Sequence, residues 1–443
     1  MLAEVASLYR VEQDPPSMDI AAWQKLTTQH EARSVATWQT RRALLSPSQR
    51  QSVWAWQHPS PEQLWQDTPR GPLTGVPYVA KDLFHVSGVP TLAGSVIHPQ
   101  PARRTSALIA KLASLGAGLV AKTHLHEFAY GLTGTNPHYG DVEHPRHVGR
   151  TAGGSSSGSA AAVAAGCVPF GLGTDTAGSL RVPAAYCGLF SFRGQPGHRW
   201  VTDAFPLAPS FDTAGWLTTT AGDCAKLWEL LHGTDQAVSS STTRGAYLPS
   251  ASLGIAPSSP ENMTALDTAG NLLATESLNA DHLLTAACRD VDVTYSILQS
   301  TEAFAVHQSA LDRDRSNYGP AVWQRIDRGR HWTSTQVDGA RLHALKIRAA
   351  YDRFFDAFDF LVTPVSLEPA PSGGTDADTT RETLLKLNTH VSIAGRPALS
   401  VPVTLPDGLT LGLQVVFRSV SCPVIPAIFA RCESCFPPVY DSR

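Results

Sequence analysis

The segment that most constrains this chain is glycine- and serine-rich and then becomes alanine-rich, GRTAGGSSSGSAAAVAAG at residues 149–166. Because alanine is a strong helix former and serine a favoured N-cap, the segment predicts a loop that enters a helix near residue 158. The apolar run CVPFGLG at 167–173 predicts a buried strand. A tight loop at 174–179 and a helix at 180–187 are expected to follow it.

An earlier stretch of the chain shows the same alternation of strand and helix. Residues 75–80 predict a short strand that ends at Lys81. Residues 106–116 place apolar side chains on one helical face, and residues 118–122 predict the next strand. Helices and strands in alternation predict an α/β fold.

The rest of the chain divides into helical and irregular stretches. Residues 19–57 predict one or two helices, and residues 270–356 are mostly helical in composition. Residues 235–262 are rich in Ser, Thr, Pro and Ala, which predicts a surface loop. Strands are expected at 358–365 and 399–403. The composition changes nowhere sharply enough to separate independent domains.

Composition excludes several classes of protein. Of the 443 residues, 42% are apolar and 16% charged, so a sizeable core is available and a disordered chain is excluded. The 35 Lys and Arg residues nearly balance the 38 Asp and Glu residues, which gives no electrostatic reason to expect nucleic acid or a membrane as a partner. With no apolar run that could span a bilayer, no recognisable signal peptide and seven sparse cysteines, a cytoplasmic protein with reduced thiols is expected. Cys432 and Cys435 form a C-x-x-C pair with no second pair of ligands nearby, so no metal site is expected.

Three polar side chains stand where a strand ends or a glycine-rich loop turns: Lys81, Ser155 and Ser179. A lysine at the end of a buried strand is desolvated, which lowers the pKa of its ammonium group and makes it a base near neutral pH. A serine becomes a strong nucleophile when a neighbouring base takes its proton. Together the three groups suggest nucleophilic catalysis by a serine that a neighbouring base activates.

The loop around Ser179 carries two further features. Four backbone N–H groups fall in a tight turn before a helix, where they can point together at a developing oxyanion: Thr176, Ala177, Gly178 and Ser179. Asp175 and Arg181 flank the serine, and we expect them to fix the loop by hydrogen bonds, with Arg181 also able to touch an anionic substrate. Taken singly, each group fits an ordinary turn, cap or solvated charge.

Other motifs compete for the same residues. GLGTDTAG lacks the last glycine of a dinucleotide-binding fingerprint, and GGSSSGS lacks the Gly-Lys-Ser/Thr ending of a phosphate-binding loop. Residues 154–158 do satisfy G-x-S-x-G, the nucleophile elbow of an α/β-hydrolase esterase. That alternative makes Ser156 the nucleophile, with Asp359 and His390 as its partners. The elbow needs an apolar strand directly before it, and none is present here.

Together these stretches resemble the amidase signature family. The match covers about residues 70–195, with weaker support around 350–420, and it includes GVPYVAKDLFHVSGVPTLAGS, EFAYG, GGSSSGSAAAVAAG and GTDTAGSLRVPAAYCG in the family's order and spacing. The resemblance implies a Ser–Ser–Lys triad. Lys81 matches the base, Ser155 the bridging serine that follows a cis peptide bond, and Ser179 the nucleophile.

The resemblance also implies a fold and a division of the chain. The expected fold is an α/β/α sandwich around a large mixed, mostly parallel sheet. Residues 66–443 would form the amidase signature domain, with residues 1–65 as a helical segment packed on it. The C-terminal half would supply the pocket. There Asn388 and residues 395–402 resemble the family's late strand, and residues 412–414 its closing one.

Three departures from the family pattern bear on the substrate. Ala177 stands where the family usually has glycine, THLH at 123–126 replaces Thr-Asn-x-Asp, and FRGQPGHRW at 192–200 replaces a commoner Leu-Lys-Pro-Thr run. None removes a member of the triad, so catalysis is expected. The departures at 177 and 192–200 also motivate an alternative, a binding or scaffold subunit without catalytic activity.

The implied function is hydrolysis of the C–N bond of a small amide or of a urea or carbamoyl derivative. It would proceed through an acyl-enzyme that releases ammonia or an amine, with Ser156 in a supporting role and no metal or cofactor required. EFAYGLTGTNPHYG is similar both to urea-derivative hydrolases, carboxybiuret hydrolase among them, and to the A subunit of glutamyl-tRNA amidotransferase. The second group releases ammonia from glutamine and needs partner subunits. The apolar N-terminal helices suggest a homodimer. A small partner subunit is the other possibility that the sequence leaves open.

Overall fold

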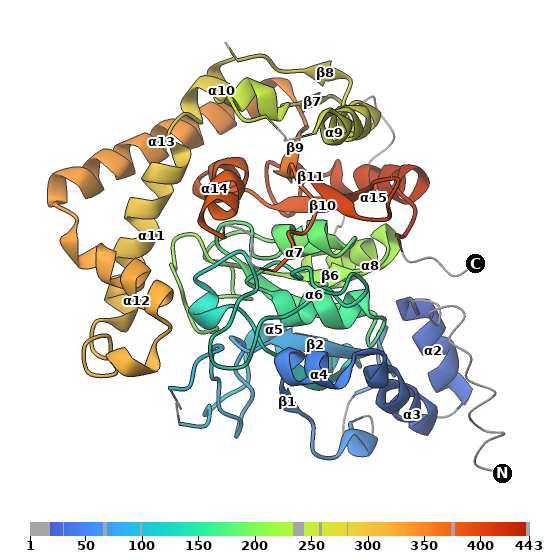
Figure 1. The fold of residues 1–443 in the computed structure, drawn as a ribbon. Coiled ribbons are helices and arrows are strands. Elements are labelled where there is room, and N and C mark those ends of the chain that lie inside the picture. The colour runs from blue at the N-terminus through green and yellow to red at the C-terminus, as the bar shows by residue number, and fades with distance from the viewer. Residues whose placement is uncertain are drawn as a thin grey trace.

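Within the described residues, eleven strands form one sheet in the order β1-β3-β2-β4-β6-β5-β10-β11-β9-β7-β8 (Figure 1). The computed structural model describes residues 18–29, 31–64, 69–97, 100–233, 243–256, 259–280, 282–373 and 377–439. The strands are β1 (Trp54–Gln57), β2 (Pro77–Lys81), β3 (Gly118–Thr123), β4 (Phe170–Asp175), β5 (Phe190–Arg193), β6 (Thr213–Thr218), β7 (Gly245–Tyr247), β8 (Glu276–Ser277), β9 (Phe360–Ser366), β10 (Ala398–Thr404) and β11 (Thr410–Phe417).

The sheet is mixed, as predicted, but the expectation that it is mostly parallel is wrong, because six of the ten neighbouring pairs of described strands are antiparallel. Its parallel pairs lie toward its two ends. Parallel pairing joins β2 to β3 and β4, and β7 to β8 and β9. The neighbours between these two groups are antiparallel, as is the edge pair of β1 and β3. Because parallel strands need a crossover, a helix separates β2 from β3 in the chain, whereas a short turn joins the antiparallel strands β10 and β11.

Helices cover both faces of this sheet. Side chains of β9 alternate between two cores, with Phe360 and Val362 in one cluster and Leu361 and Val365 in the other. The first core includes α8, α9 and α15, and the second includes α7, α11, α13 and α14 (Figure 1). The α/β/α sandwich is therefore confirmed. The helices are α2 (Ile20–Gln29), α3 (Glu31–Arg41), α4 (Pro47–Val53), α5 (Ala107–Ser114), α6 (Ser157–Ala164), α7 (Arg181–Tyr186), α8 (Ala221–His232), α9 (Pro260–Leu273), α10 (Leu283–Ala287), α11 (Val291–His307), α12 (Pro320–Asp327), α13 (Ser334–Ala357), α14 (Ala377–Ile393) and α15 (Ile425–Cys435).

The strands and helices predicted around the site are confirmed, but the strands β1, β5, β6, β7 and β8 were not predicted. β2 ends at Lys81, α5 and α6 lie where helices were expected, and β4 begins three residues later than the apolar run that predicted it. β1 lies inside the segment expected to be helical, and β7 lies inside the expected loop at 235–262. β1 and β7 are at most four residues long, too short to show an alternating pattern of apolar residues. They are strands because they pair with β3 and β9. Residues 235–242 and 257–258 of that loop lie outside the described part.

The N-terminal helices are bonded to the body of the sheet. Ser34 Oγ donates to the carbonyl of Gly75, and Arg41 Nε donates to the carbonyl of Gly166. The division of the chain at residues 65 and 66 stays a prediction, although β1 on its N-terminal side belongs to the sheet. A homodimer also stays a prediction. Among the described residues, no helix combines the length and the apolar character needed to traverse a lipid bilayer.

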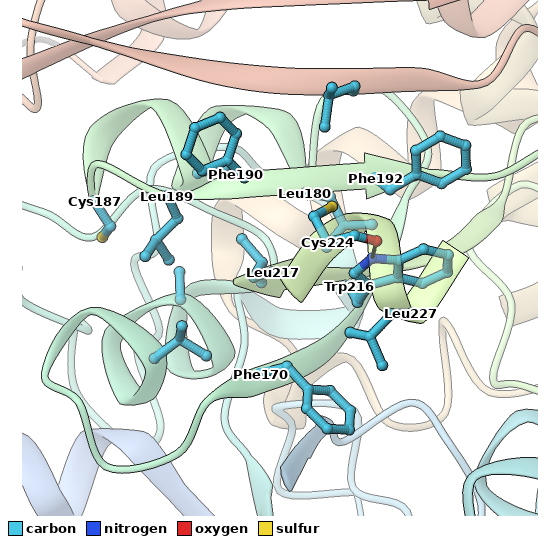
Figure 2. Packing of buried hydrophobic residues seen from close by; sticks show 14 of the residues in the cluster. Phe170, Leu180, Cys187, Leu189, Phe190, Phe192, Trp216, Leu217, Cys224 and Leu227 are labelled. Atoms are coloured by element: carbon cyan, nitrogen blue, oxygen red, sulfur yellow. Dashed lines mark hydrogen bonds between the residues drawn. The ribbon is translucent and has the colours of Figure 1, made fainter. Parts of the chain in front are cut away.

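An aromatic core between β5, β6 and α8 supports the loop that carries Ser179 (Figure 2). The rings of Phe192 and Trp216 stack with centroids 5.3 Å apart, and Trp216 Nε1 donates to the carbonyl of Cys224. Leu180, next to Ser179 in the chain, packs into this core directly over Gly173. A Cβ atom added to Gly173 would lie 2.6 Å from Leu180 Cδ2 and would displace that side chain. The absence of a side chain at Gly173 therefore helps to position the Ser179 loop.

Truncation of Trp216 to alanine is expected to lower the free energy of unfolding by about 3–5 kcal/mol, because it leaves a cavity under β5 and β6. Urea denaturation measures the change. Trp216→Phe keeps a ring against Phe192 and should cost clearly less. Equal losses for the two variants would contradict a packing role for the stacked pair.

Candidate active site

Lys81 lies at the end of β2 and is fully buried. Its Nζ donates to Ser155 Oγ at 2.7 Å and to Thr174 Oγ1 at 2.8 Å. Burial lowers the pKa of Lys81 to about 7, although the charges of Asp175 and Asp212 act to raise it. A substantial share of the lysine is therefore unprotonated at neutral pH, as expected from its position at a strand end.

Ser155 lies in the glycine-rich loop just before α6. The peptide bond between Gly154 and Ser155 is cis, as the resemblance implied. The carbonyl of Ser155 accepts from the N–H of His126 at 3.2 Å, and the N–H of Gly154 donates to the carbonyl of Leu132 at 2.8 Å. The loop is thus held by main-chain bonds to residues 126–132.

Ser179 lies in the loop between β4 and α7 and is 2% exposed. Its carbonyl accepts from the N–H of Ser156 at 3.1 Å, so the two serine loops are joined through their main chains. The Ser156 hydroxyl donates to the carbonyl of Thr174 at 3.1 Å. The structure bonds Lys81 directly to Ser155. Within the described residues, no hydrogen bond joins the hydroxyls of Ser155 and Ser179.

The four expected oxyanion donors are not equivalent. The N–H of Gly178 donates to Asp175 Oδ1 at 2.8 Å, so this donor is already engaged. The N–H groups of Thr176, Ala177 and Ser179 have no acceptor among the described residues. These three residues are buried, and a buried N–H without a partner is costly unless a ligand supplies an acceptor.

A buried ion pair holds the Ser179 loop. Arg181 Nε and Nη2 donate to the two carboxylate oxygens of Asp175, at 2.9 and 2.8 Å. Arg181 also donates to the carbonyl of Asn388, to Gln414 Oε1 and to Ser392 Oγ. These hydrogen bonds agree with the loop-fixing role predicted for both residues. The suggestion that Arg181 also touches an anionic substrate is wrong, because its fully buried guanidinium is occupied by these protein acceptors.

The same surroundings keep Asp175 ionised. Burial by itself would raise the pKa of Asp175, but the charge and hydrogen bonds of Arg181 outweigh it. The charge of Arg193 and the N–H of Gly178 act in the same direction, and together they hold the pKa well below its usual range. The carboxylate is therefore a fixed negative charge beneath the loop that carries Ser179.

The site contains two polar residues that no local pattern had marked. Thr174 accepts from Lys81 and is the first threonine of the GTDTAGS loop. Asp212 accepts from the hydroxyl of Thr176 at 2.7 Å and from the N–H groups of Leu207 and Ala208. Since Asp212 lies far along the chain from the loop that it supports, only the fold reveals its role.

The residues of the nucleophile-elbow alternative do not come together. His390 is buried on α14, where its Nε2 donates to the carbonyl of Leu387 and its Nδ1 accepts from the hydroxyl of Tyr351. Asp359 is exposed and accepts from the N–H of Arg244. Neither side chain is bonded to Ser156, so this alternative is wrong.

A cavity of about 410 Å³ opens beside the Ser155 loop. Its wall includes the segment that bonds to Gly154 and Ser155 and parts of α12 and α14, and it contains His126, Leu132, Thr133, Val322, Arg325 and Arg381. A space of this size accommodates a small molecule.

A family model described as Amidase matches residues 50–421. The chain belongs to the amidase family. AtzE, a 1-carboxybiuret hydrolase subunit of Pseudomonas sp. (strain ADP), is 31% identical to this amidase over 377 residues, which cover 78% of this chain and 80% of that protein. The A subunit of the glutamyl-tRNA(Gln) amidotransferase of Chromohalobacter salexigens is 31% identical over 385 residues, which cover 78% and 79%.

A solved structure supports the same assignment. The crystal structure of an amidase matches this amidase with a TM-score of 0.83 at 30% identity, covering 95% of this chain and 100% of that one. The resemblance seen in the sequence and the expected enzyme class, an amide hydrolase, are thereby confirmed.

Replacement of Asp175 by asparagine is expected to lower the free energy of unfolding by about 3–5 kcal/mol, because it leaves the Arg181 charge buried without its counterion. Urea denaturation at neutral pH measures the loss. The matched control is Asp312→Asn, since Asp312 is an exposed carboxylate paired with Arg330 and should matter far less. Similar losses in the two variants would contradict the anchoring role of Asp175.

Proposed function

We propose that this amidase hydrolyses the C–N bond of a small amide, or of a urea or carbamoyl derivative, through a Ser–Ser–Lys triad of Lys81, Ser155 and Ser179. The observation that carries the proposal is the 2.7 Å bond from the fully buried Lys81 Nζ to Ser155 Oγ. The main-chain bond between Ser156 and Ser179 adds to it, because it holds the loop of the nucleophile against that of Ser155.

The reaction begins with the attack of Ser179 Oγ on the carbonyl carbon of the amide. Ser155 takes the proton of Ser179 and passes its own proton to neutral Lys81. The N–H groups of Thr176, Ala177 and Ser179 donate to the oxyanion that forms. The C–N bond then breaks as Ser155 delivers a proton to the leaving nitrogen and recovers one from Lys81. This step releases ammonia or an amine and leaves an ester on Ser179.

Hydrolysis of that ester completes the cycle. Water gives a proton to the same relay and attacks the acyl carbon. The bond to Ser179 Oγ then breaks, the proton returns to Ser179, and a carboxylic or carbamic acid leaves. Every proton taken up by Lys81 is returned within the cycle, so the chain needs no further acid or base.

A second candidate is the glutamine-hydrolysing component of an aminoacyl-tRNA amidotransferase. It is supported by the identity of 31% with the A subunit of a glutamyl-tRNA(Gln) amidotransferase over most of the chain. Ammonia release from small amides by the isolated chain favours simple hydrolysis, whereas ammonia release from glutamine only after mixing with partner subunits favours the second function. A cytoplasmic location stays a prediction, and so does a partner subunit.

Ser179→Ala should abolish covalent labelling by a fluorophosphonate probe, because it removes the nucleophile. Mass spectrometry of the intact protein measures the label. Absence of label on the folded wild-type chain would contradict the proposal and favour the non-catalytic scaffold.

Two matched variants make the labelling experiment specific. Ser157→Ala removes a buried hydroxyl that has no hydrogen-bond partner among the described residues, so the label should persist. Ser156→Ala removes the serine of the rejected elbow, so the label should persist there also. Loss of label only in Ser156→Ala would transfer the role of nucleophile to that residue.

The pH dependence of kcat/KM should follow Lys81. Its pKa of about 7 lies below the ordinary 10.5, so the neutral base forms as pH rises through about 7. We expect kcat/KM to fall about tenfold per pH unit on the acid side and to level off above this pH. Between about pH 7 and 10.5 the unfolded chain holds a proton on Lys81 that the folded chain has released, so this group makes the free energy of unfolding rise with pH across that range.

Thr174→Val provides the matched variant for the pH experiment. The Thr174 hydroxyl accepts from Lys81 and so stabilises its charged form. Without this acceptor the rising limb should shift to lower pH. A midpoint that stays fixed in Thr174→Val, or that persists in Lys81→Met, would contradict the assignment.

A further inference from the structure

Asp212 is a buried carboxylate just before β6, and its two oxygens have different partners. Oδ1 accepts from the hydroxyl of Thr176 at 2.7 Å, and Oδ2 accepts from the N–H groups of Leu207 and Ala208 at 2.8 and 3.0 Å. Burial raises the pKa of Asp212, while these bonds and the charge of Lys81 act against it. A protonated carboxyl group would need an acceptor, and among the described residues each bonded partner is a donor. The ionised form therefore fits this environment.

The turn that precedes Asp212 fixes the position of the carboxylate. The N–H groups of Phe211 and Asp212 both donate to the carbonyl of Ala208 at 2.9 Å, which closes the turn on which Oδ2 rests. Phe211 packs edge-on against Tyr295 of α11, with ring centroids 5.3 Å apart. Because Asp212 is attached to a packed part of the molecule, its bond to Thr176 holds that residue in place.

Two carboxylates hold the Ser179 loop, one on each side of the nucleophile. Asp175 accepts three main-chain N–H groups toward the C-terminal side, those of Gly178, Leu180 and Arg181. Asp212 holds the N-terminal side through the hydroxyl of Thr176. The main-chain N–H of Thr176 has no acceptor among the described residues. The bond to Asp212 thus fixes a residue whose own donor is left free for an oxyanion.

Asp212 also places a negative charge near Lys81. Burial lowers the pKa of Lys81, and the charges of Asp175 and Asp212 act against that effect. Asp175 is directly paired with Arg181 at 2.8 Å. In the part of the chain that the structure describes, no cation is hydrogen-bonded to Asp212. Its charge therefore acts on the lysine without a bonded counterion.

Three further titratable groups interact with Asp212: Arg193 on β5, and Tyr295 and Glu302 on α11. Burial lowers the pKa of Arg193 to about 10, so this side chain stays charged at neutral pH. Burial raises the pKa of Tyr295 well above its usual value, so this side chain stays neutral. Glu302 is only partly buried and accepts from the N–H and the hydroxyl of Ser210. Its carboxylate provides a control for the charge of Asp212.

We propose that Asp212 is a positioning residue of the Ser179 site, which orients the N–H of Thr176 toward the oxyanion and places a negative charge beside the Lys81 relay. This inference rests on the proposed function. The hydrogen bond acts on the stability of the oxyanion, because a donor held in place needs no reorganisation during the reaction. The charge acts on the strength of the base, because a nearby negative charge favours the protonated lysine.

The test is the rate at which a fluorophosphonate probe labels Ser179, measured across pH. The phosphonyl oxygen of the probe occupies the place of the oxyanion, so the rate reports both contributions without an amide substrate. In the wild-type chain the rate should rise with pH through about 7, as neutral Lys81 forms, and then reach a plateau.

Asp212→Asn removes the charge and keeps the hydrogen bond. The amide nitrogen can donate to Thr176 Oγ1, and the amide oxygen can accept from the N–H groups of the preceding turn. The midpoint of the labelling rate should move to lower pH by about one unit. Glu302→Gln is the matched control, since it removes another carboxylate of this region, and its midpoint should stay fixed. A fixed midpoint in Asp212→Asn, or an equal shift in both variants, overturns the role of the charge.

Thr176→Val removes the hydrogen bond and keeps the charge. The plateau rate should fall about tenfold or more with the midpoint unchanged, and Thr176→Ser, which keeps the hydroxyl, should restore most of it. Thr218→Val is the matched control. Thr218 is buried at the opposite end of β6 and donates to the carbonyl of Thr220 at 2.8 Å, so this variant loses a comparable bond away from the site. A plateau rate that survives in Thr176→Val, or that falls equally in Thr218→Val, overturns the positioning role.

These results separate the inference from the proposed function. If the wild-type chain labels at Ser179 and hydrolyses amides while Asp212→Asn and Thr176→Val match it at every pH, the inference fails and the proposed function stands. If the wild-type chain hydrolyses no amide and labelling still depends on Asp212 and Thr176 as expected, the role of Asp212 stands and amide hydrolysis fails. Absence of label on the folded wild-type chain overturns both.

Discussion

The buried ion pair between Asp175 and Arg181 is the interaction on which the rest of the site depends. The carboxylate ends β4 and accepts the N–H groups of Gly178, Leu180 and Arg181, so it determines the shape of the loop that carries Ser179. Since both charges are out of water, the pair is favourable only while their hydrogen bonds are complete. Any change that displaces one partner acts directly on the loop that carries Ser179.

The sheet brings Lys81 to the loop that carries Ser179. Because β2 and β4 are parallel neighbours, the end of β2 places Lys81 against the end of β4, where Thr174 and the Ser179 loop begin. Burial at this junction lowers the pKa of the lysine, while the same burial leaves backbone N–H groups of the loop without acceptors among the described residues. One low-dielectric location thus provides what the proposed mechanism requires, a lysine of lowered pKa and free N–H donors.

The residues that the sequence revealed are those whose role is local. Lys81 at a strand end and Ser155 in a glycine-rich loop were recognisable because a few neighbours define their surroundings. Asp212 was not recognisable, since its partner Thr176 comes from a distant segment. β1 was missed because an edge strand of four residues has no clear period of its own. The engagement of Gly178 by Asp175 likewise depends on backbone geometry that residue types do not specify.

Arg181 is also held by residues that come much later in the chain. The carbonyl of Asn388 and the side chain of Gln414, which accept from Arg181, lie 207 and 233 positions after it. During synthesis, the loop that carries Ser179 leaves the ribosome long before these acceptors exist. A nascent chain therefore carries Lys81, Ser155 and Ser179 for much of its translation without the groups that hold Arg181. The guanidinium gains its full set of acceptors only once the strand that contains Gln414 has emerged and paired.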